Sequence, residues 1–370
     1  MTICSRCVMD DTATLITYDN NGVCKYCKNF ETKLSKGGFL NDNALSPDID
    51  KFKFEVQNSS LQYDCIVGVS GGIDSSFALV KAVELGLRPL AVHMDNGWNT
   101  ELAQSNIENL VKKLNVDLYT HVIRWSEYRF LMQALFDADV LDVELLYDNA
   151  MRAVNYKMAK KYGTKFILSG VNSSTEGIGI PEGWNWIKTD VTNILALARR
   201  SDKHYKFASF PNISTLETLK FQLQGYKWIP FLDYFSYKKE EAKTMLVRDF
   251  DYKPYPYKHY ENVFTRFYQG YILPKKFGVD KRKAHLSSLI ITNQITRDQA
   301  IEDLKNDPYV SLEALEKDKK YFLKKMKWSE DDLQSYLSRQ PISHANYPNE
   351  KKYVFLILAL RKLRKILYRA

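Results

Sequence analysis

The residues best suited to chemistry lie in one bend that follows a short apolar run. The segment IVGVSGGIDSS, which begins at Ile66, places two glycines, an acid and three hydroxyl side chains within seven positions. Residues 63–69 have the length and β-branched content of a buried strand, and residues 74–86 have helical periodicity. Amides at a helix N-terminus attract anions, and glycines let a ligand approach the backbone. The bend therefore predicts a phosphate site, with an ordinary strand-to-helix turn as the alternative.

The spacing of this bend differs from the common phosphate-binding signatures. Both G-x-x-x-x-G-K-[ST] and G-x-G-x-x-G are absent there, and the match is to S-G-G-x-D-S. The bend resembles the PP-loop of ATP pyrophosphatases, which cleave ATP between the α and β phosphates and transfer AMP to a substrate oxygen. The resemblance implies that Asp74 reaches Mg²⁺. The implied ATP-binding residues of the bend are Ser70, Gly71, Gly72, Asp74, Ser75 and Ser76.

Four of the five cysteines have the spacing of a metal site. Cys4, Cys7, Cys24 and Cys27 form two C-x2-C pairs with sixteen residues between them, inside the window for a Cys4 zinc site. A closed tetrahedral set has no open position for substrate, so we predict a structural Zn²⁺ that folds a small N-terminal module. Disulfides are disfavoured in a reducing compartment, whereas an iron–sulfur cluster is the stronger competing interpretation. The fifth cysteine, Cys65, is expected in the core of a strand.

Strands and helices alternate after the bend. Apolar runs predict strands at 89–94, 117–123 and 165–170, and helical periodicity covers 100–114, 126–138 and 145–162. This order predicts parallel βαβ units in a doubly wound sheet, whose ligands bind beyond the carboxyl ends of the strands. The candidate ATP contacts at those ends are His93, Asp95, Ser169 and Gly170.

Two of these candidates belong to segments with competing interpretations. The backbone at His93 is expected to meet adenine or ribose, while its side chain is more typical of a satisfied core histidine. After Gly170, a polar bend supplies Asn172, Thr175 and Glu176, which are expected to face the acyl group of a substrate. A polar surface loop is the alternative for that bend.

From position 181 aromatic residues become dense and strand alternation disappears, which predicts a mostly helical domain. The chain then divides into a Cys4 module (1–35), a connector (36–61), a PP-loop ATP-binding domain (62–180) and a helical substrate- or partner-binding domain (181–370). The stretch YILPKKFGVDKRKAHLSSLI, from Tyr271, gathers five basic residues and His285. Fixed cations suit a site that neutralises phosphates, although charge runs are usually solvated faces.

Several segments together resemble the N-acetyl sugar amidotransferase family of surface-polysaccharide biosynthesis. They are CSRCVMD, GVSGGIDSS, STEG and KHYENVFTRFYQGYILPKKFGVDKRKAHLSSLI. The resemblance covers nearly the whole chain. It implies an α/β fold of the PP-loop (adenine nucleotide alpha hydrolase-like) type and an enzyme that converts an acetamido group on a nucleotide-linked sugar, of lipopolysaccharide O-antigen, capsule or a related glycan, into an acetamidino group. Carried over by position, the family's basic segment falls on Lys276, Asp280, Lys281, Arg282 and His285.

These considerations define the remaining candidate residues. The candidate catalytic residues are Asp74, Glu176, Lys276 and Lys281. The candidate substrate contacts are Asn172, Thr175, Lys258, His259, Arg282 and His285. In the implied reaction, AMP is transferred to the amide oxygen and ammonia then displaces AMP. Lys276 or Lys281 is expected at the α phosphate, and Glu176 is expected to accept a proton from ammonia.

The source of ammonia and the competing functions follow from the cysteines. Glutamine hydrolysis needs an activated cysteine nucleophile, and no cysteine here has that setting. Ammonia is therefore expected from a separate glutaminase subunit or from solution. The main alternative function is a PP-loop tRNA thiolation enzyme, which needs a sulfur carrier near Ser70. A non-catalytic zinc-containing scaffold is a further alternative.

Composition and net charge restrict the class of protein and the partners that can be expected. The chain is 45% hydrophobic and 26% charged, as in ordinary globular proteins. Its net charge is +9, but seven positive charges follow Glu350, which leaves about +2 for the rest and argues against a nucleic-acid partner. We find no signal peptide and no apolar run long enough to span a bilayer, so a cytoplasmic protein is expected. The basic tail is interpreted as a helix docked on its own domain, with a membrane or partner contact as the alternative.

Overall fold

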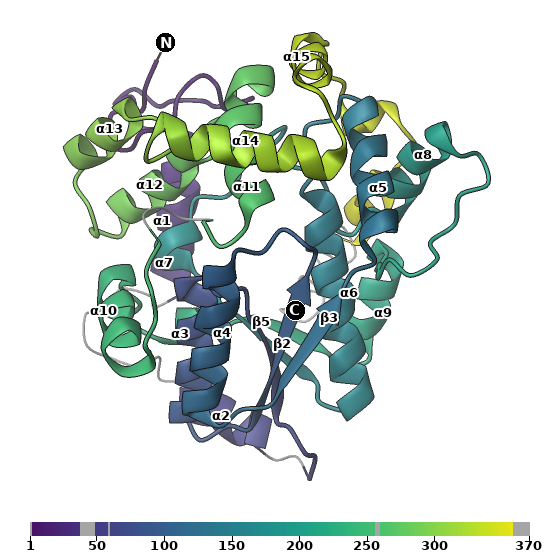
Figure 1. Ribbon diagram of the computed structural model, residues 1–370. Coiled ribbons are helices and arrows are strands. Elements are labelled where there is room, and N and C mark those ends of the chain that lie inside the picture. Colours follow the sequence, from purple (N-terminus) through teal and green to yellow (C-terminus); the bar gives the residue numbers. More distant parts are fainter. Residues whose placement is uncertain (1, 38–48, 58–59, 256–259, 358–370) are drawn as a thin grey trace.

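A five-stranded parallel sheet lies at the centre of the computed structural model, which describes residues 2–37, 49–57, 60–255 and 260–357 (Figure 1). The strand order is β3-β2-β1-β4-β5. The strands are β1 (Cys65–Gly68), β2 (Pro89–Asp95), β3 (Leu118–Val122), β4 (Phe166–Ser169) and β5 (Lys227–Pro230). The predicted α/β class with a doubly wound parallel sheet is confirmed.

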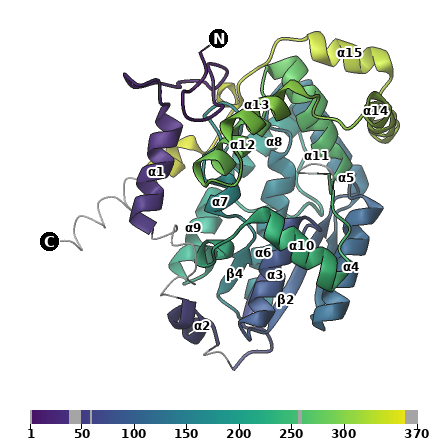
Figure 2. The same ribbon diagram turned by 90° about the vertical axis from the view of Figure 1, so that its left-hand side faces the viewer.

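Helices cover both faces of the sheet because successive strand residues point to opposite sides. In β1, Ile66 belongs to the core that includes α6, and Val67 belongs to the core that includes α3 and α4. Figures 1 and 2 show the sheet between these two helical layers. The helices of this part are α2 (Ile49–Gln57), α3 (Ile73–Glu84), α4 (Glu101–Leu114), α5 (Trp125–Asp137), α6 (Leu145–Tyr162) and α7 (Ser173–Glu176).

The chain direction creates a binding crevice beside β1. From β1 the strands proceed outward through β2 to β3, and the chain then returns to place β4 on the other side of β1. The strand order therefore reverses between β1 and β4, and open α/β sheets bind ligands at such a reversal.

One strand comes from the half of the chain that was expected to contain none. β5 pairs with β4, with Trp228 opposite Ile167. The segment KWIP is only four residues long, too short for periodicity to distinguish it from a loop. Position 181 therefore does not end the sheet, although the rest of this half is helical. Its elements are α8 (Val191–Ser201), α9 (Thr215–Leu223), η1 (Phe231–Tyr234), α10 (Lys239–Phe250), α11 (Val263–Phe267), η2 (Tyr268–Phe277), α12 (Arg282–Ile291), α13 (Arg297–Lys305), α14 (Leu312–Met326), α15 (Glu330–Ser338) and η3 (His344–Asn346).

The N-terminal segment packs against this helical half. Helix α1 (Lys25–Gly37) begins directly after Cys24 and contains Cys27, and it contacts α12, which also contacts α7 and α13. Figure 2 shows α1 beside these helices, with α2 at the opposite end of the sheet. Helix α2 lies within the segment predicted as a connector. Lys258, His259 and the basic tail from position 358 lie outside the described residues.

Candidate functional site

The bend between β1 and α3 is closed by its own hydroxyl groups. The Ser70 and Ser75 Oγ atoms lie 3.1 Å apart, and Ser75 Oγ also accepts the Ser70 amide proton at 3.1 Å. Ser70 Oγ in turn accepts from the Gly72 amide at 3.3 Å. Gly71 has a φ of +83°, and a Cβ there would lie 2.7 Å from the Ala103 carbonyl oxygen. The S-G-G-x-D-S spacing thus builds a compact turn that only glycine at position 71 permits.

A second bend from β4 contacts the first. A Cβ on Gly170 would lie 2.6 Å from the Ser75 amide nitrogen and 2.8 Å from the Asp74 carbonyl oxygen. The residues that end β1 and β4 are therefore in direct backbone contact at the point where the strand order reverses. As predicted, the two bends lie next to each other at one edge of the sheet.

A cavity of about 600 Å³ opens over this edge, within the usual size range for small-molecule sites. Both bends contribute to its wall, as do Glu176, Lys281 and His285. The candidates from the first bend that line it are Ser70, Gly72, Asp74 and Ser75, and those from the second are Ser169 and Gly170. Asp74 accepts a hydrogen bond from the Tyr237 hydroxyl. The structure thus brings together most of the candidate ATP residues with three of the candidates for chemistry on the acceptor.

One face of α6 forms the opposite wall. Six residues at or after its N-terminus recur with helical spacing along the cavity: Glu144, Tyr147, Asp148, Met151, Arg152 and Asn155. From the first to the last they extend about 16 Å along the helix axis. None was a candidate in the sequence, because polar residues at this spacing are typical of a solvent-facing stripe.

Two lysines of the helical half, Lys281 and Lys188, form ion pairs with carboxylates at this wall. Lys281 Nζ lies 2.7 Å from Glu144 Oε2, and the two side chains are only 11% and 10% exposed. Lys188 Nζ lies 2.7 Å from Asp142 Oδ2 and 2.8 Å from Asp148 Oδ2. Burial alone would raise the pKa of Glu144, but the Lys281 ammonium more than compensates and lowers it. Burial would likewise lower the pKa of Lys188, yet Asp142 and Asp148 raise it. Glu144 and Lys188 therefore stay charged at neutral pH.

Lys276 lies outside the cavity wall. Its ammonium donates to the carbonyl oxygens of Tyr336 at 2.6 Å and Arg339 at 2.7 Å, and it is 3.0 Å from Asp139. Its side chain is fully buried there, and burial lowers its pKa. Lys276 is not part of the cavity wall, so its expected contact with the α phosphate is corrected: it cross-links η2 to α15.

Other substrate candidates also have local structural roles. Asn172 caps α7 by accepting from the Thr175 amide at 2.8 Å, and the Thr175 hydroxyl donates to the same oxygen. Arg282 pairs with Asp280 at 2.8 Å. Asn172, Thr175 and Arg282 do not line the cavity, although Asn172 and Thr175 orient the turn that carries Glu176.

The two candidates on β2, His93 and Asp95, support the site without lining the cavity. His93 is buried, its Nδ1 lies 2.9 Å from the Val69 carbonyl oxygen, and its Nε2 lies 3.0 Å from Asn99 Nδ2. These partners assign the proton to Nδ1, and burial lowers the pKa of His93. Asp95 accepts from the Gly97 amide at 2.7 Å. Neither side chain lines the cavity, and Ser76 is likewise buried behind the bend.

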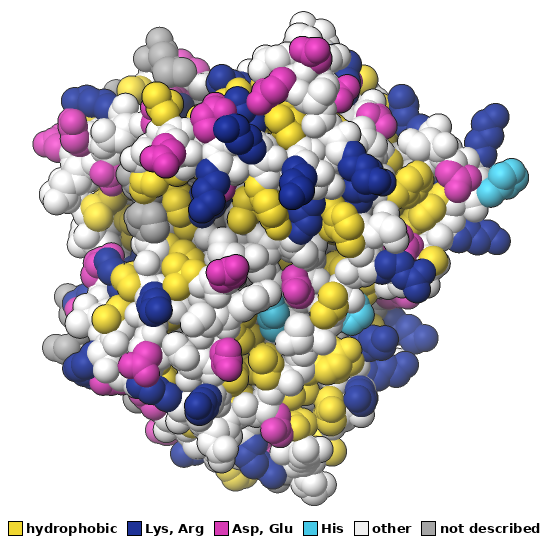
Figure 3. Space-filling model, viewed as in Figure 1, with side chains coloured by type: hydrophobic (Ala, Val, Ile, Leu, Met, Phe, Trp, Pro, Cys, Tyr) yellow, Lys and Arg dark blue, Asp and Glu magenta, His cyan; other side chains and the backbone are white. Residues whose placement is uncertain are grey.

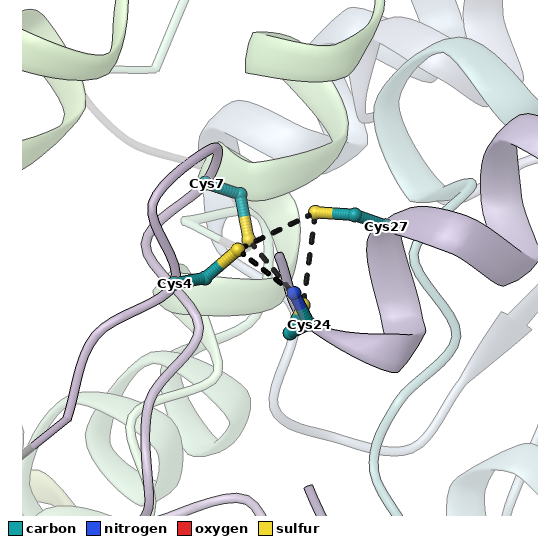
Figure 4. Close-up of side chains that lie close together, drawn as sticks. All are labelled: Cys4, Cys7, Cys24 and Cys27. Carbon is teal, nitrogen blue, oxygen red and sulfur yellow. Dashed lines mark hydrogen bonds between the residues drawn. The ribbon is translucent and has the colours of Figure 1, made fainter. Parts of the chain in front are cut away.

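The four N-terminal cysteines converge into one cluster (Figure 4). Their sulfur atoms all lie within 4.8 Å of one another, with Cys4–Cys27 at 3.8 Å, Cys7–Cys24 at 3.9 Å and Cys24–Cys27 at 3.6 Å. A tetrahedral ion with Zn–S bonds of about 2.3 Å requires sulfur separations of about 3.8 Å. In a four-iron cluster each thiolate binds a different iron, which spreads the sulfur atoms further apart. The donor set and its dimensions therefore fit a single tetrahedral ion.

The cysteine cluster is joined to the cavity through α12. Arg297 donates to the carbonyl oxygens of Cys7 at 3.1 Å and Cys4 at 3.0 Å, and Lys283 pairs with Asp10. Two residues after Lys283 on α12, His285 lines the cavity. The cysteine module thus supports the helix that carries this part of the wall.

Cys65 lies at the opposite end of β1 from the bend. Its side chain is fully buried, and burial raises the pKa of its thiol. It has the character of a core cysteine, as predicted, and neither lines the cavity nor offers a thiolate. Among the described helices, none has the length and apolar character needed to cross a bilayer.

Comparison with known proteins finds a family model that is similar to the basic C-terminal segment. Residues 261–363 match the C-terminal domain of LPS biosynthesis proteins of the WbpG-like type. The chain is also 28% identical over 176 residues to an uncharacterized protein of Methanocaldococcus jannaschii, a match that spans 45% of this chain and 58% of that protein.

Two synthetases are among the solved structures that match this chain. The NMN synthetase of Francisella tularensis matches with 16% identity and a TM-score of 0.30, over 63% of this chain and 99% of that one. The NH3-dependent NAD synthetase of Campylobacter jejuni, in complex with the nitrate ion, matches with 15% identity and a TM-score of 0.28, over 77% of this chain and 99% of that one. The match over residues 261–363 is the comparison relevant to the N-acetyl sugar amidotransferase resemblance noted in the sequence. Over residues 261–363 the chain is similar to the C-terminal domain of WbpG-like lipopolysaccharide biosynthesis proteins.

Proposed function

We propose that this chain is an ATP-dependent amidotransferase of surface-polysaccharide biosynthesis, which converts the acetamido group of a nucleotide-linked sugar into an acetamidino group. The observation that carries the proposal is the shared cavity. The S-G-G-x-D-S bend forms one wall, and Lys281 and His285 of the LPS-biosynthesis segment form another. An ATP-type bend and the family-specific segment are thus in position to act on one pair of substrates.

The chemistry has two steps with balanced atoms. The amide oxygen attacks the α phosphorus of ATP, diphosphate leaves, and an O-adenylyl imidate forms. Ammonia then adds to the imidate carbon, AMP leaves with the former amide oxygen, and a proton is lost to a base. An amide is otherwise a poor electrophile, because its nitrogen donates into the carbonyl and oxide cannot leave.

The side chains of the cavity fit these steps. The amides of residues 70–75 would stabilise charge on the departing diphosphate. Asp74 would hold Mg²⁺, which supplies charge neutralisation at the phosphates when bound. Lys281, fixed by Glu144 at 2.7 Å, would contact the α phosphate, and Glu176 would accept the proton from ammonia. We propose that Cys4, Cys7, Cys24 and Cys27 hold structural Zn²⁺, and that ammonia comes from a separate glutaminase subunit or from solution.

The burial of Cys65 weighs against the tRNA thiolation alternative. A thiolation enzyme needs a sulfur carrier beside the ATP bend, and Cys65 is sealed in the core at the other end of β1. The proposal is tested by mass spectrometry of the chain with ATP, Mg²⁺, ammonium and a panel of nucleotide-linked N-acetyl sugars. One sugar should exchange oxygen for NH while AMP forms in equal amount. AMP formation without any change in a sugar would refute the acceptor, and no AMP with any acceptor would refute the enzyme.

A further inference from the structure

The inner end of the cavity contains a buried polar atom without a partner. Asn155, on α6, is 2% exposed, and its Nδ2 donates to the Met151 carbonyl oxygen at 2.8 Å. That bond fixes the orientation of the carboxamide, because a flipped amide would set two oxygens against each other. Within the described part of the chain, Asn155 Oδ1 accepts no hydrogen bond. A buried acceptor left open costs about 1–3 kcal/mol, so it calls for a ligand that donates.

The position of this acceptor relates it to the ATP bend. Asn155 Oδ1 would lie 3.3 Å from a Cβ on Gly68, and both residues line the cavity. Gly68 precedes Ser70 by two residues, which corresponds to about 7 Å along a strand. A side chain at position 68 would crowd the carboxamide, so glycine there leaves room for Asn155 beside β1.

The surrounding walls favour a flat heteroaromatic ring. The side chains that line the cavity near the ends of β1, β2, β4 and β5 include Val92, Met94, Leu168 and Trp228, with Met151 on α6. The Arg152 guanidinium lies 5.2 Å from the Trp228 ring centre and adds a second planar surface. The large apolar share of these walls suits a flat ring better than the hydroxyls of a sugar. Glu144, Asp148 and Lys281 lie towards the N-terminal end of α6.

We infer that Asn155 is the base-specificity residue of the nucleotide site and that its Oδ1 accepts a proton from the exocyclic amino group of adenine. The inference rests on the proposed ATP-dependent function and deepens it. Guanine would present a carbonyl oxygen to the same atom, so two acceptors would face each other. The cavity should therefore select ATP over nucleotides that lack a 6-amino group.

The test compares ATP with purine riboside triphosphate, which differs only by loss of the 6-amino group. Binding to the full chain is measured by calorimetry with Mg²⁺ and without ammonia or sugar. Wild type should bind ATP at least about tenfold more tightly than the analogue, because the open acceptor is satisfied by ATP alone. Asn155→Leu should lose this preference, chiefly through about tenfold weaker ATP binding. Met151→Leu alters the same wall without changing an acceptor and should keep the preference.

Three outcomes would overturn the inference. Equal binding of both nucleotides by wild type would refute it while leaving the ATP site intact, and this measurement needs no variant to fold. Loss of N-acetyl sugar binding in Asn155→Leu with an unchanged nucleotide preference would assign the atom to the acceptor substrate. Failure of wild type to bind either nucleotide would instead refute the ATP site itself.

Discussion

Single side chains in the cavity owe their charge states to pairing. Glu144 and Lys281 are both about nine-tenths buried, and each would be costly to ionise there without the other. Lys276, five positions earlier in the same basic run, is equally committed to Asp139 but outside the cavity. Only the three-dimensional arrangement separates these two lysines, since the run KKFGVDKRK gives them the same appearance.

The backbone of the S-G-G-x-D-S bend should not tolerate a side chain at position 71. Gly71→Ala should reduce AMP formation by about 100-fold or more, because a Cβ would approach the Ala103 carbonyl oxygen to 2.7 Å at a φ of +83° and displace the bend. Gly179→Ala is the matched control, since nothing lies within 4 Å of its added Cβ. AMP formation is measured for both variants. Wild-type turnover by Gly71→Ala would contradict the assigned geometry.

A buried histidine predicts how stability responds to acid. His344 Nε2 accepts from the Asp142 amide at 3.1 Å, its Nδ1 lies 2.7 Å from Asn193 Oδ1, and burial lowers the pKa of His344 to about 4. Below its unfolded pKa of about 6.5, only the unfolded chain binds the proton. His344 should therefore reduce the free energy of unfolding as pH falls from 6.5 to 4, by up to about 3 kcal/mol.

The contribution of His344 is isolated by a variant. His344→Gln retains an acceptor for the Asp142 amide but has no titrating group in this range. Urea unfolding of both proteins at several pH values should give a flatter pH dependence for the variant. Parallel curves would show that His344 titrates normally in the folded state.

Among the elements, the strands and the bend were predictable, whereas the α6 wall and β5 were not. Runs such as CIVG and FILS predict buried strands because they are apolar on both faces. The cavity face of α6 carries Glu144, Asp148 and Arg152, a composition that looks solvent-exposed until the helical half packs over it. β5 is too short to carry periodicity, and the strand pairing with β4 decides its conformation. Hydrophobic patterns in the sequence thus predict the individual strands and helices. The cavity wall on α6 depends on tertiary packing, which the sequence patterns do not reveal.

The cysteine module predicts a metal with a recognisable geometry. Purified chain should contain about one zinc per molecule, and replacement by Co²⁺ should give the intense visible bands of a tetrahedral thiolate site. Removal of the metal should lower the melting temperature and increase hydrogen exchange in α12, which Lys283 ties to the module, and in α13, which Arg297 ties to it. Iron together with acid-labile sulfide would contradict a single-ion site.

In the whole molecule the two halves of the chain share one core. Phe231, Leu232 and Leu246 are fully buried in the same cluster as Val67 and Leu168. Surface charge shows no comparable organisation: on the face in Figure 3, Lys and Arg side chains are interspersed with acidic ones. Cohesion therefore comes from the apolar core that spans position 181.

This shared core predicts that the expected ATP-binding segment is not autonomous. A fragment of residues 62–180 lacks β5 and the side chains that cover β4, so it should not unfold cooperatively in urea, whereas the full chain should. Circular dichroism measures both. A cooperative transition in the fragment would show that residues 62–180 form a domain by themselves.

In the proposed reaction, AMP activates the amide oxygen of the sugar within this cavity. Oxygen labelling follows that atom: a nucleotide-linked N-acetyl sugar that carries ¹⁸O in the acetyl carbonyl is incubated with the chain, ATP, Mg²⁺ and ammonium. Every AMP released with a converted sugar should carry one ¹⁸O, because the amide oxygen leaves on the phosphate. Converted sugar accompanied by unlabelled AMP would contradict the proposed reaction, since the oxygen would then have left by another route.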